Sequence, residues 1–233
     1  MRLDKFLCEL NIGSRSQVKD YIRKGLVTVN SLPAAKPEQQ IDEHKDRITF
    51  RGKQLSYQPF VYYMLNKPAG VVSATQDNTS KTVLDLITSD CKKDLFPVGR
   101  LDKDTEGLLL LTNDGELAHK LLSPKKHVDK TYLVGIEKPL SYEQVTALEQ
   151  GVDIGERRLT LPAKVVLLSE NQIILTIHEG KFHQIKRMLQ AVDNRVLALK
   201  RLSFGPLSLD EKLSLGEYRE LTEQEVISLY ENG

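Results

Sequence analysis

Apolar residues recur at three- and four-residue spacing in the first part of the chain, which is the spacing of an amphipathic helix. One such stripe lies within residues 3–10. A second helix is expected after Ser14, because Ser14 and Gln17 have the spacing of a capping box. Gly25 suits the left-handed position that follows a helix, and the β-branched residues of segment 26–30 indicate a strand. The N-terminal part is therefore predicted to contain two helices and a small sheet.

Three prolines and scattered charges interrupt this pattern between residues 31 and 60, where we expect a short strand at 47–50 and then a linker. The sequence thus predicts two domains, residues 1–58 and residues 59–233. The second part has no internal repeat or low-complexity run. Its strand-like and helix-like segments alternate, which is typical of one α/β or α+β body.

Short apolar runs and turn residues define the elements expected in this second part. We expect strands at 61–66 and 108–112, a turn at 67–70, helical segments at 82–87 and 117–122, and a last helix that opens near Gly180.

The composition is that of a globular protein with one sizeable core and a small accessory module, since 40% of its 233 residues are hydrophobic. No stretch approaches the roughly 18 consecutive apolar residues of a membrane span, and the first residues do not follow the pattern of a secretory leader. A cytosolic protein is expected. Cys8 and Cys91 lack the spacing of a disulfide framework or a zinc site.

The net charge of +1 conceals an uneven distribution. Residues 1–58 contain 11 Lys and Arg against 7 Asp and Glu, a net charge of +4, which leaves 22 against 25, a net charge of −3, for the remainder. A basic module beside a nearly neutral body is typical of phosphate binding. A solvated basic face without a ligand explains the charge count equally well.

A charged segment, residues 100–107, leads directly into the apolar run at 108–112 and is the strongest candidate for chemistry. A loop supported by a rigid strand is a frequent location of functional residues. Asp102 and Asp104 lie beside Arg100 and Lys103, so a structural network of ion pairs is the simpler interpretation of the spacing alone.

The longer motif around this segment changes that interpretation. Residues 99–115 (GRLDKDTEGLLLLTNDG) resemble the catalytic signature of the RsuA-type pseudouridine synthases. The resemblance continues, in the order of the family, at 65–70 (LNKPAG), 130–132 (KTY) and 179–188 (EGKFHQIKRM), and residues 1–58 resemble an S4 RNA-binding domain. It covers nearly the whole chain and implies an α+β fold whose catalytic body has a central, mostly antiparallel sheet.

The resemblance implies that Asp102 is the essential aspartate of an enzyme that isomerises uridine to pseudouridine. This reaction breaks an N-glycosidic bond, turns the uracil and rejoins it to the sugar through carbon, without a redox change. An aspartate, with a reference pKa of about 3.9, acts in such a reaction as a nucleophile or as a base toward a sugar proton. Both routes stay open, and neither a metal nor an organic cofactor is implied.

Tyr132 matches the pocket tyrosine of the family. A base must leave its stack before it reacts, and aromatic stacking worth roughly 1–3 kcal/mol per base offsets that cost. The alternative is a core tyrosine with a hydrogen-bonded hydroxyl.

Lys186 occupies the position of the basic residue that pairs with the aspartate in the family, where many members of the wider superfamily have arginine. At about 100° per residue, Lys186 lies on the flank of the apolar stripe of the last helix, whereas Arg187 points roughly away from it. Loss of one member of a buried ion pair typically costs about 3–5 kcal/mol. Lys186→Ala is therefore expected to impair folding and activity together. The apolar stripe comprises Ile185, Met188, Leu189 and Val192.

Further residues are candidates for contact with RNA. Arg100 is expected to hold a phosphate or the active-site loop, with an ion pair to Asp104 or Glu106 as the equal alternative. The histidines lack the spacing of a zinc enzyme, so a supporting or RNA-contact role is expected for His183. The other candidates are basic or hydroxyl side chains: Arg187 in the body, and Arg2, Lys5, Arg15, Ser16, Lys19, Arg23 and Lys24 in the N-terminal module.

The predicted function is isomerisation of one uridine in 16S ribosomal RNA, because the motifs at 130–132 and 179–188 look closest to the small-subunit branch of the family. The expected partner is this RNA within a small-subunit assembly intermediate, without membrane attachment, and the protein is expected to be a monomer. The same reaction on 23S RNA is one alternative. A non-catalytic ribosome-assembly factor that retains the fold is the other.

Overall fold

The computed structural model describes residues 1–10, 12–43, 45–55, 60–88, 94–123 and 126–232. The chain forms two compact units, an N-terminal unit, Met1–Phe60, and a C-terminal unit, Val61–Thr88 with Asp94–Gly233. The predicted boundary between residues 58 and 59 lies outside the described residues, as does Cys91.

The N-terminal unit has two helices, α1 (Leu3–Glu9) and α2 (Arg15–Arg23), beside a small antiparallel sheet. The capping box predicted at Ser14 is present, because its hydroxyl accepts from the backbone N–H of Gln17 and the Gln17 side chain accepts from the backbone N–H of Ser14. Gly25 is left-handed, with φ of 69°, as the sequence predicts. The strands, in their order across the sheet, are β2 (Leu32–Pro33), β1 (Val27–Val29), β3 (Ile48–Phe50) and β4 (Lys53–Leu55).

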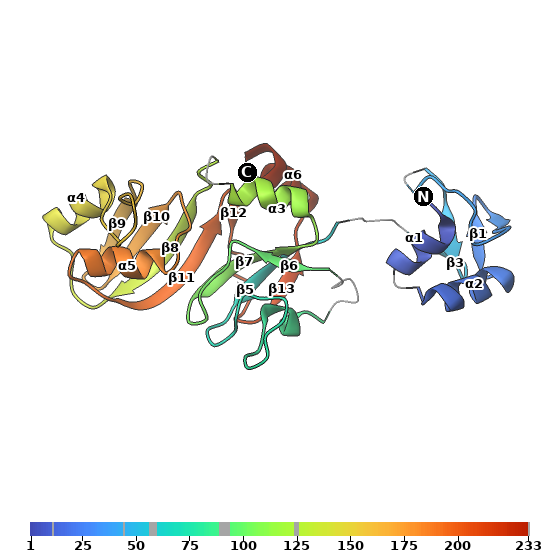
Figure 1. Ribbon diagram of the computed structural model, residues 1–233, viewed down its shortest axis with the longest axis horizontal. Helices are drawn as coiled ribbons and strands as arrows, with labels where there is room; N and C mark the ends of the chain where they lie inside the picture. The colour runs from blue at the N-terminus through green and yellow to red at the C-terminus, as the bar shows by residue number, and fades with distance from the viewer. Residues whose placement is uncertain (11, 44, 56–59, 89–93, 124–125, 233) are drawn as a thin grey trace. The chain divides into compact units, whose positions relative to one another are not determined.

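One large sheet forms the centre of the C-terminal unit (Figure 1). Its order is β13-β5-β7-β11-β8-β10-β9, with β6 paired to β7 and β12 to β11. Only β7 and β11 pair in parallel among the described strands, so the sheet is mostly antiparallel and the predicted α+β class is confirmed. The strands are β5 (Tyr62–Lys67), β6 (Phe96–Val98), β7 (Glu106–Thr112), β8 (Lys130–Ile136), β9 (Lys164–Ser169), β10 (Gln172–Ile177), β11 (Val196–Phe204), β12 (Leu207–Ser208) and β13 (Tyr218–Glu220).

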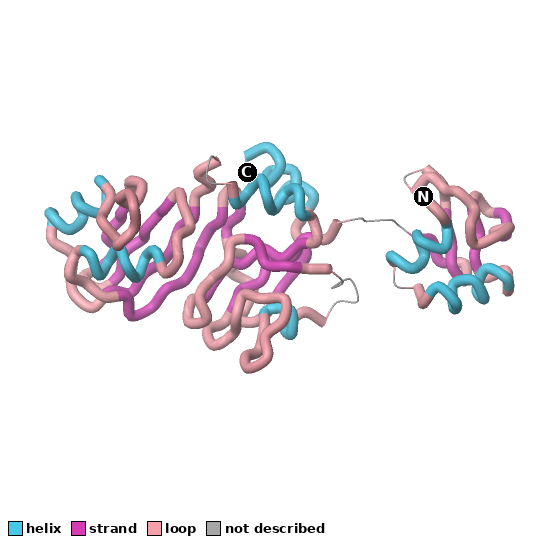
Figure 2. The backbone as a smooth tube through the Cα atoms, viewed as in Figure 1, coloured by secondary structure: helices cyan, strands magenta, loops and turns pink. Residues whose placement is uncertain are grey.

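Helices cover both faces of this sheet because its strands alternate apolar side chains between two cores. Tyr63 and Leu65 join one core with residues of α4 and α5, whereas Met64 joins the other core with residues of α3 and α6. In Figure 2, α4 and α5 lie by the half of the sheet that contains β8 and β11, and α3 and α6 lie by the other half. The helices are the 3₁₀ helix η1 (Val83–Leu86), α3 (Gly115–Leu122), α4 (Tyr142–Gln150), α5 (Gln184–Ala191) and α6 (Glu223–Asn232).

The last predicted helix begins later than expected. It was predicted to open near Gly180, but α5 begins at Gln184. His183 has φ of 49° and ψ of 34°, a left-handed conformation that cannot continue a right-handed helix backward. The predicted apolar stripe of this helix is buried, which confirms that part of the prediction.

The parallel contact between β7 and β11 is short and determines where the site forms. It consists of the pairs Glu106 with Lys200 and Gly107 with Arg201. Gly107 has φ of 100°, and a Cβ there would lie 2.2 Å from the carbonyl oxygen of Arg201, so only glycine permits this approach. The loop before β7, which carries Asp102, and α5, the helix before β11, therefore lie close to each other where these two strands meet.

Candidate active site

A cavity of about 710 Å³ lies at this junction within the C-terminal unit. The loop before β7 contributes Asp102, strand β8 contributes Tyr132, and the beginning of α5 contributes His183 and Lys186. Residues from three predicted motifs, far apart in the sequence, therefore line one cavity.

Asp102 lies between two nitrogen-bearing side chains. Its Oδ2 is 3.2 Å from Nζ of Lys186, and its Oδ1 is 3.7 Å from Nε2 of His183. The side chains of Asp102 and Lys186 are each 28% exposed, so the pair is accessible from solvent. The cost of about 3–5 kcal/mol expected for a buried pair is too large for this partly exposed one, because water screens it.

Lys186 also holds Asp104, for which the sequence suggested Arg100 as the alternative ion-pair partner. Nζ of Lys186 donates to both carboxylate oxygens of Asp104, at 2.6 and 2.9 Å. The hydrogen bond from Lys186 lowers the pKa of Asp104. Burial lowers the pKa of Lys186, but the two carboxylates outweigh burial and raise the pKa overall. Lys186 therefore stays cationic beside Asp102.

Tyr132 is only 7% exposed and packs in the core beside the cavity that it lines. Arg201 lines the same cavity from β11, close enough for its charge to interact with the Tyr132 hydroxyl. Tyr132 therefore lines the cavity while it is packed in the core, and its role in base stacking stays a prediction.

Arg201 was missed by the sequence analysis. It is 1% exposed, its Nε donates to the carbonyl oxygen of Leu108, and its guanidinium packs on the ring of Phe204. Burial lowers its pKa, and its Nη2 has no hydrogen-bond partner among the described residues. The only signal in the sequence was a single arginine within a strand-forming segment.

Lys67 was also given no role by the sequence analysis, although it lies in one of the motifs. It is fully buried at the end of β5, and Nζ donates toward the carbonyl oxygens of Asp102, Lys103 and Thr105, at 3.0, 3.3 and 2.8 Å. Burial lowers its pKa to about 8. The ammonium of Lys67 thus holds the backbone of the loop that carries Asp102, because it binds three carbonyl oxygens of that loop at once.

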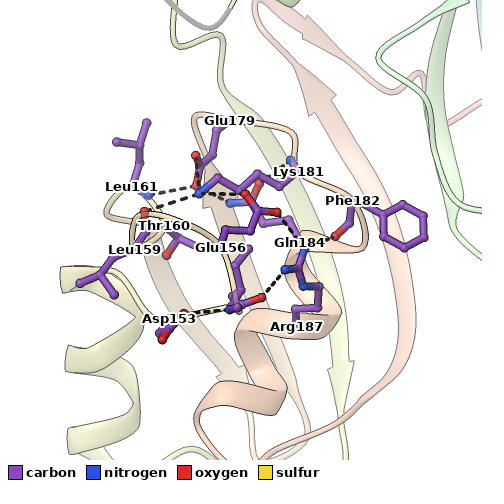
Figure 3. Close-up of polar contacts among 12 residues, drawn as sticks. Asp153, Glu156, Leu159, Thr160, Leu161, Glu179, Lys181, Phe182, Gln184 and Arg187 are labelled. Carbon is purple, nitrogen blue, oxygen red and sulfur yellow. Dashed lines mark hydrogen bonds and ion pairs between the residues drawn. The ribbon is translucent and has the colours of Figure 1, made fainter.

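The other predicted residues of the body lie in different surroundings. Arg100 lines the cavity, and among the described residues it forms no ion pair with Asp104 or Glu106. Arg187 lies on α5 outside the set of residues that line the cavity. Its guanidinium donates to Glu156 and to the carbonyl oxygens of Ile154 and Phe182, as Figure 3 shows for Glu156 and Phe182.

The basic residues predicted to contact RNA in the N-terminal unit are exposed. Arg15, Lys19 and Arg23 follow one another at four-residue spacing along α2. Other members have acidic neighbours, since Arg2 pairs with Asp4 and Lys24 pairs with Asp20. Lys5 pairs with Glu9, and Ser16 is hydrogen-bonded to Ser14.

No group of three or more potential metal ligands was found among the described residues. His178 is hydrogen-bonded to Asp129 at 2.6 Å, and His183 faces Asp102 as described above. Within the same part of the chain, no helix has both the length and the apolar character needed to cross a bilayer.

Two family models match this chain. The model for RNA pseudouridylate synthase matches residues 61–191, and the model for the S4 domain matches residues 1–48. The first match spans more than half of the chain and contains every cavity residue discussed above except Arg201.

Similar proteins match along almost their whole length. An uncharacterised RNA pseudouridine synthase of Bacillus subtilis, YtzG, is 49% identical over 99% of both chains. The ribosomal small subunit pseudouridine synthase A of Vibrio cholerae is 40% identical over 99% of this chain and 100% of its own. A crystal structure of a pseudouridylate synthase, 39% identical, superposes with a TM-score of 0.71 over 98% of this chain and 99% of its own. The chain therefore belongs to the RNA pseudouridylate synthase family.

Proposed function

We propose that this protein isomerises a uridine of 16S ribosomal RNA to pseudouridine, with Asp102 as the catalytic carboxylate. The relatives named as ribosomal small subunit pseudouridine synthase A support the choice of RNA, because they match over nearly their whole length at about 40% identity. The observation that carries the proposal is the position of Asp102, in a cavity between Lys186 and His183.

The reaction is redox-neutral. The bond between C1′ of the ribose and N1 of uracil breaks, and a bond between C1′ and C5 forms, while C5 loses a hydrogen and N1 gains one. Asp102 acts either by attack on C1′ or by removal of a proton from the sugar. Lys186 keeps the carboxylate oriented in both routes, since its ammonium lies 3.2 Å from Oδ2.

Tyr132 and Arg201 form the proposed contact surface for the uracil. Tyr132 offers an aromatic ring inside the cavity, and base stacking on such a ring contributes roughly 1–3 kcal/mol. Arg201 lines the same cavity and has a buried Nη2 without a partner among the described residues, which would donate to an exocyclic oxygen of uracil. Together they would hold the base while it turns between its two bonding positions.

The N-terminal unit is proposed to act as the RNA-binding domain of residues 1–58, followed by the catalytic domain of residues 59–233. Its exposed cations, Arg15, Lys19 and Arg23 foremost, would contact phosphates and make affinity salt-dependent. We further propose that the protein acts as a monomer in the cytoplasm on a small-subunit assembly intermediate.

The test is a map of pseudouridine in ribosomal RNA from cells with the protein, cells without it, and cells with only Asp102→Asn. One site in 16S RNA should be lost in both deficient strains. Asp193→Asn is the matched control, because Asp193 is exposed after α5 and asparagine tolerates its left-handed conformation, φ of 55°. A loss confined to 23S RNA would refute the choice of substrate, and an unchanged map would refute the enzymatic function.

A further inference from the structure

One large aromatic side chain at the cavity is exposed rather than packed. Phe182 lines the cavity and is 70% exposed, whereas Tyr132, the other aromatic cavity residue considered above, is 7% exposed. Figure 3 shows the ring of Phe182 pointing away from the polar side chains drawn around it. Removal of an exposed phenylalanine ring from water is favourable. A partner that covers the ring of Phe182 would therefore gain binding free energy.

The ring of Phe182 has one covered face and one open face. It stacks on the imidazole of His183, with ring centroids 3.8 Å apart and planes 19° from parallel. His183 in turn lies 3.7 Å from Asp102. A planar group on the open face of Phe182 would therefore continue a stack that begins beside the catalytic carboxylate.

The backbone on both sides of this stack is held in place. Arg187 donates to the carbonyl oxygen of Phe182 at 3.0 Å, and an ion pair with Glu156 fixes the Arg187 guanidinium (Figure 3). The side chain of Gln184 accepts from the backbone N–H of Lys181 at 2.9 Å. The left-handed conformation of His183 is held between these contacts, which is a frequent feature of functional sites. The ring is thus preorganised, which lowers the entropic cost of binding.

We propose that Phe182, stacked on His183, is a platform for the nucleobase next to the target uridine in the RNA strand. The target base has to reach Asp102 and Tyr132 inside the cavity. The base that meets the exposed ring of Phe182 is then its neighbour along the strand. Stacking is tolerant of base identity, so the platform positions the strand without selecting its sequence. This inference rests on the proposed function and assigns Phe182 a positioning role in it.

The first measurement uses a single-stranded oligouridine that carries one 2-aminopurine, whose fluorescence falls when it stacks. The full-length wild-type protein and Phe182→Tyr should quench this probe, whereas Phe182→Leu should not. Tyr142→Ala is the matched control, because Tyr142 is 82% exposed on α4 and does not line the cavity. Absence of quenching by the wild type, or equal quenching by Phe182→Leu, would overturn the proposal.

The second measurement is conversion of 16S RNA under steady-state conditions. Phe182→Leu is expected to raise KM roughly 5- to 150-fold, with a smaller change in kcat, because one base stack is lost. Phe182→Tyr should restore KM, and all variants should unfold at the wild-type temperature. Normal KM for Phe182→Leu would overturn the platform while the proposed function stands. Quenching that depends on Phe182, without any conversion by the wild type, would refute the proposed function and with it the role of Phe182 beside a target uridine, and would leave only base stacking on its ring.

Discussion

Replacement of Lys67 by methionine removes the ammonium group around which the loop of Asp102 is arranged. Nζ lies within 3.3 Å of the carbonyl oxygens of Asp102, Lys103 and Thr105, and 3.0 Å from that of Pro68. The side chain is fully buried, and methionine has a similar length. The substitution therefore deletes hydrogen bonds without opening a large cavity.

The magnitude follows from two opposing contributions. Three hydrogen bonds from a charged donor contribute roughly 5–9 kcal/mol, at about 1.5–3 kcal/mol each. Burial opposes them, and its excess over the attraction of the nearby carboxylates lowers the pKa of Lys67 from 10.5 to about 8, which corresponds to roughly 3 kcal/mol. Lys67→Met is thus expected to lower the free energy of unfolding by roughly 2–6 kcal/mol.

The assay is urea unfolding at pH 7, together with the rate of uridine isomerisation at a temperature where the variant stays folded. The rate should fall, because the backbone that carries Asp102 loses its central donor. Lys103→Met is the control, since Lys103 is exposed on the same loop. Equal unfolding free energies and equal rates for wild type and Lys67→Met would refute the reasoning.

The pH dependence gives a second check on Lys67. Its folded-state pKa of about 8 lies below the ordinary value of 10.5, so the unfolded chain binds more protons between these limits. Stability from this group is fully present above the unfolded pKa and is lost as the pH falls to about 8. Wild-type stability should therefore gain up to about 1.4 kcal/mol per pH unit from Lys67 in this window, and Lys67→Met should lack that gain. The same slope in both proteins would contradict the lowered pKa.

Two further substitutions test the site and the strand junction. Lys186→Ala removes the cation 3.2 Å from Asp102, and should slow isomerisation more than tenfold while it lowers stability by only about 1 kcal/mol, since the pair is partly exposed. Normal turnover of Lys186→Ala beside an inactive Arg187→Ala would reverse the roles assigned to them. Gly107→Ala introduces a Cβ 2.2 Å from the carbonyl oxygen of Arg201, and should destabilise the protein by roughly 3 kcal/mol or more in a thermal melt. A wild-type melting temperature would show that the two strands separate easily.

Local patterns in the sequence were sufficient for most elements. The capping box at Ser14, the left-handed Gly25 and the buried stripe of α5 depend on residues close together in the chain, so spacing alone predicts them. The start of α5 was misplaced because the conformation of His183 is held by distant partners of its neighbours, among them Glu156 through Arg187. Such contacts leave no local signal.

The sequence by itself determined the family, the α+β class and the motif that contains Asp102, because each of these depends on residue identity and order. Only the tertiary structure decided how Lys186 divides its contacts between Asp102 and Asp104, and that Lys67 and Arg201 are buried cations at the site. The reason is that β7 and β11 meet only where Gly107 permits it. That contact brings together charged side chains that are far apart in the sequence, such as Asp102 and Lys186. Their charges interact only because the fold places them within a few ångströms of each other.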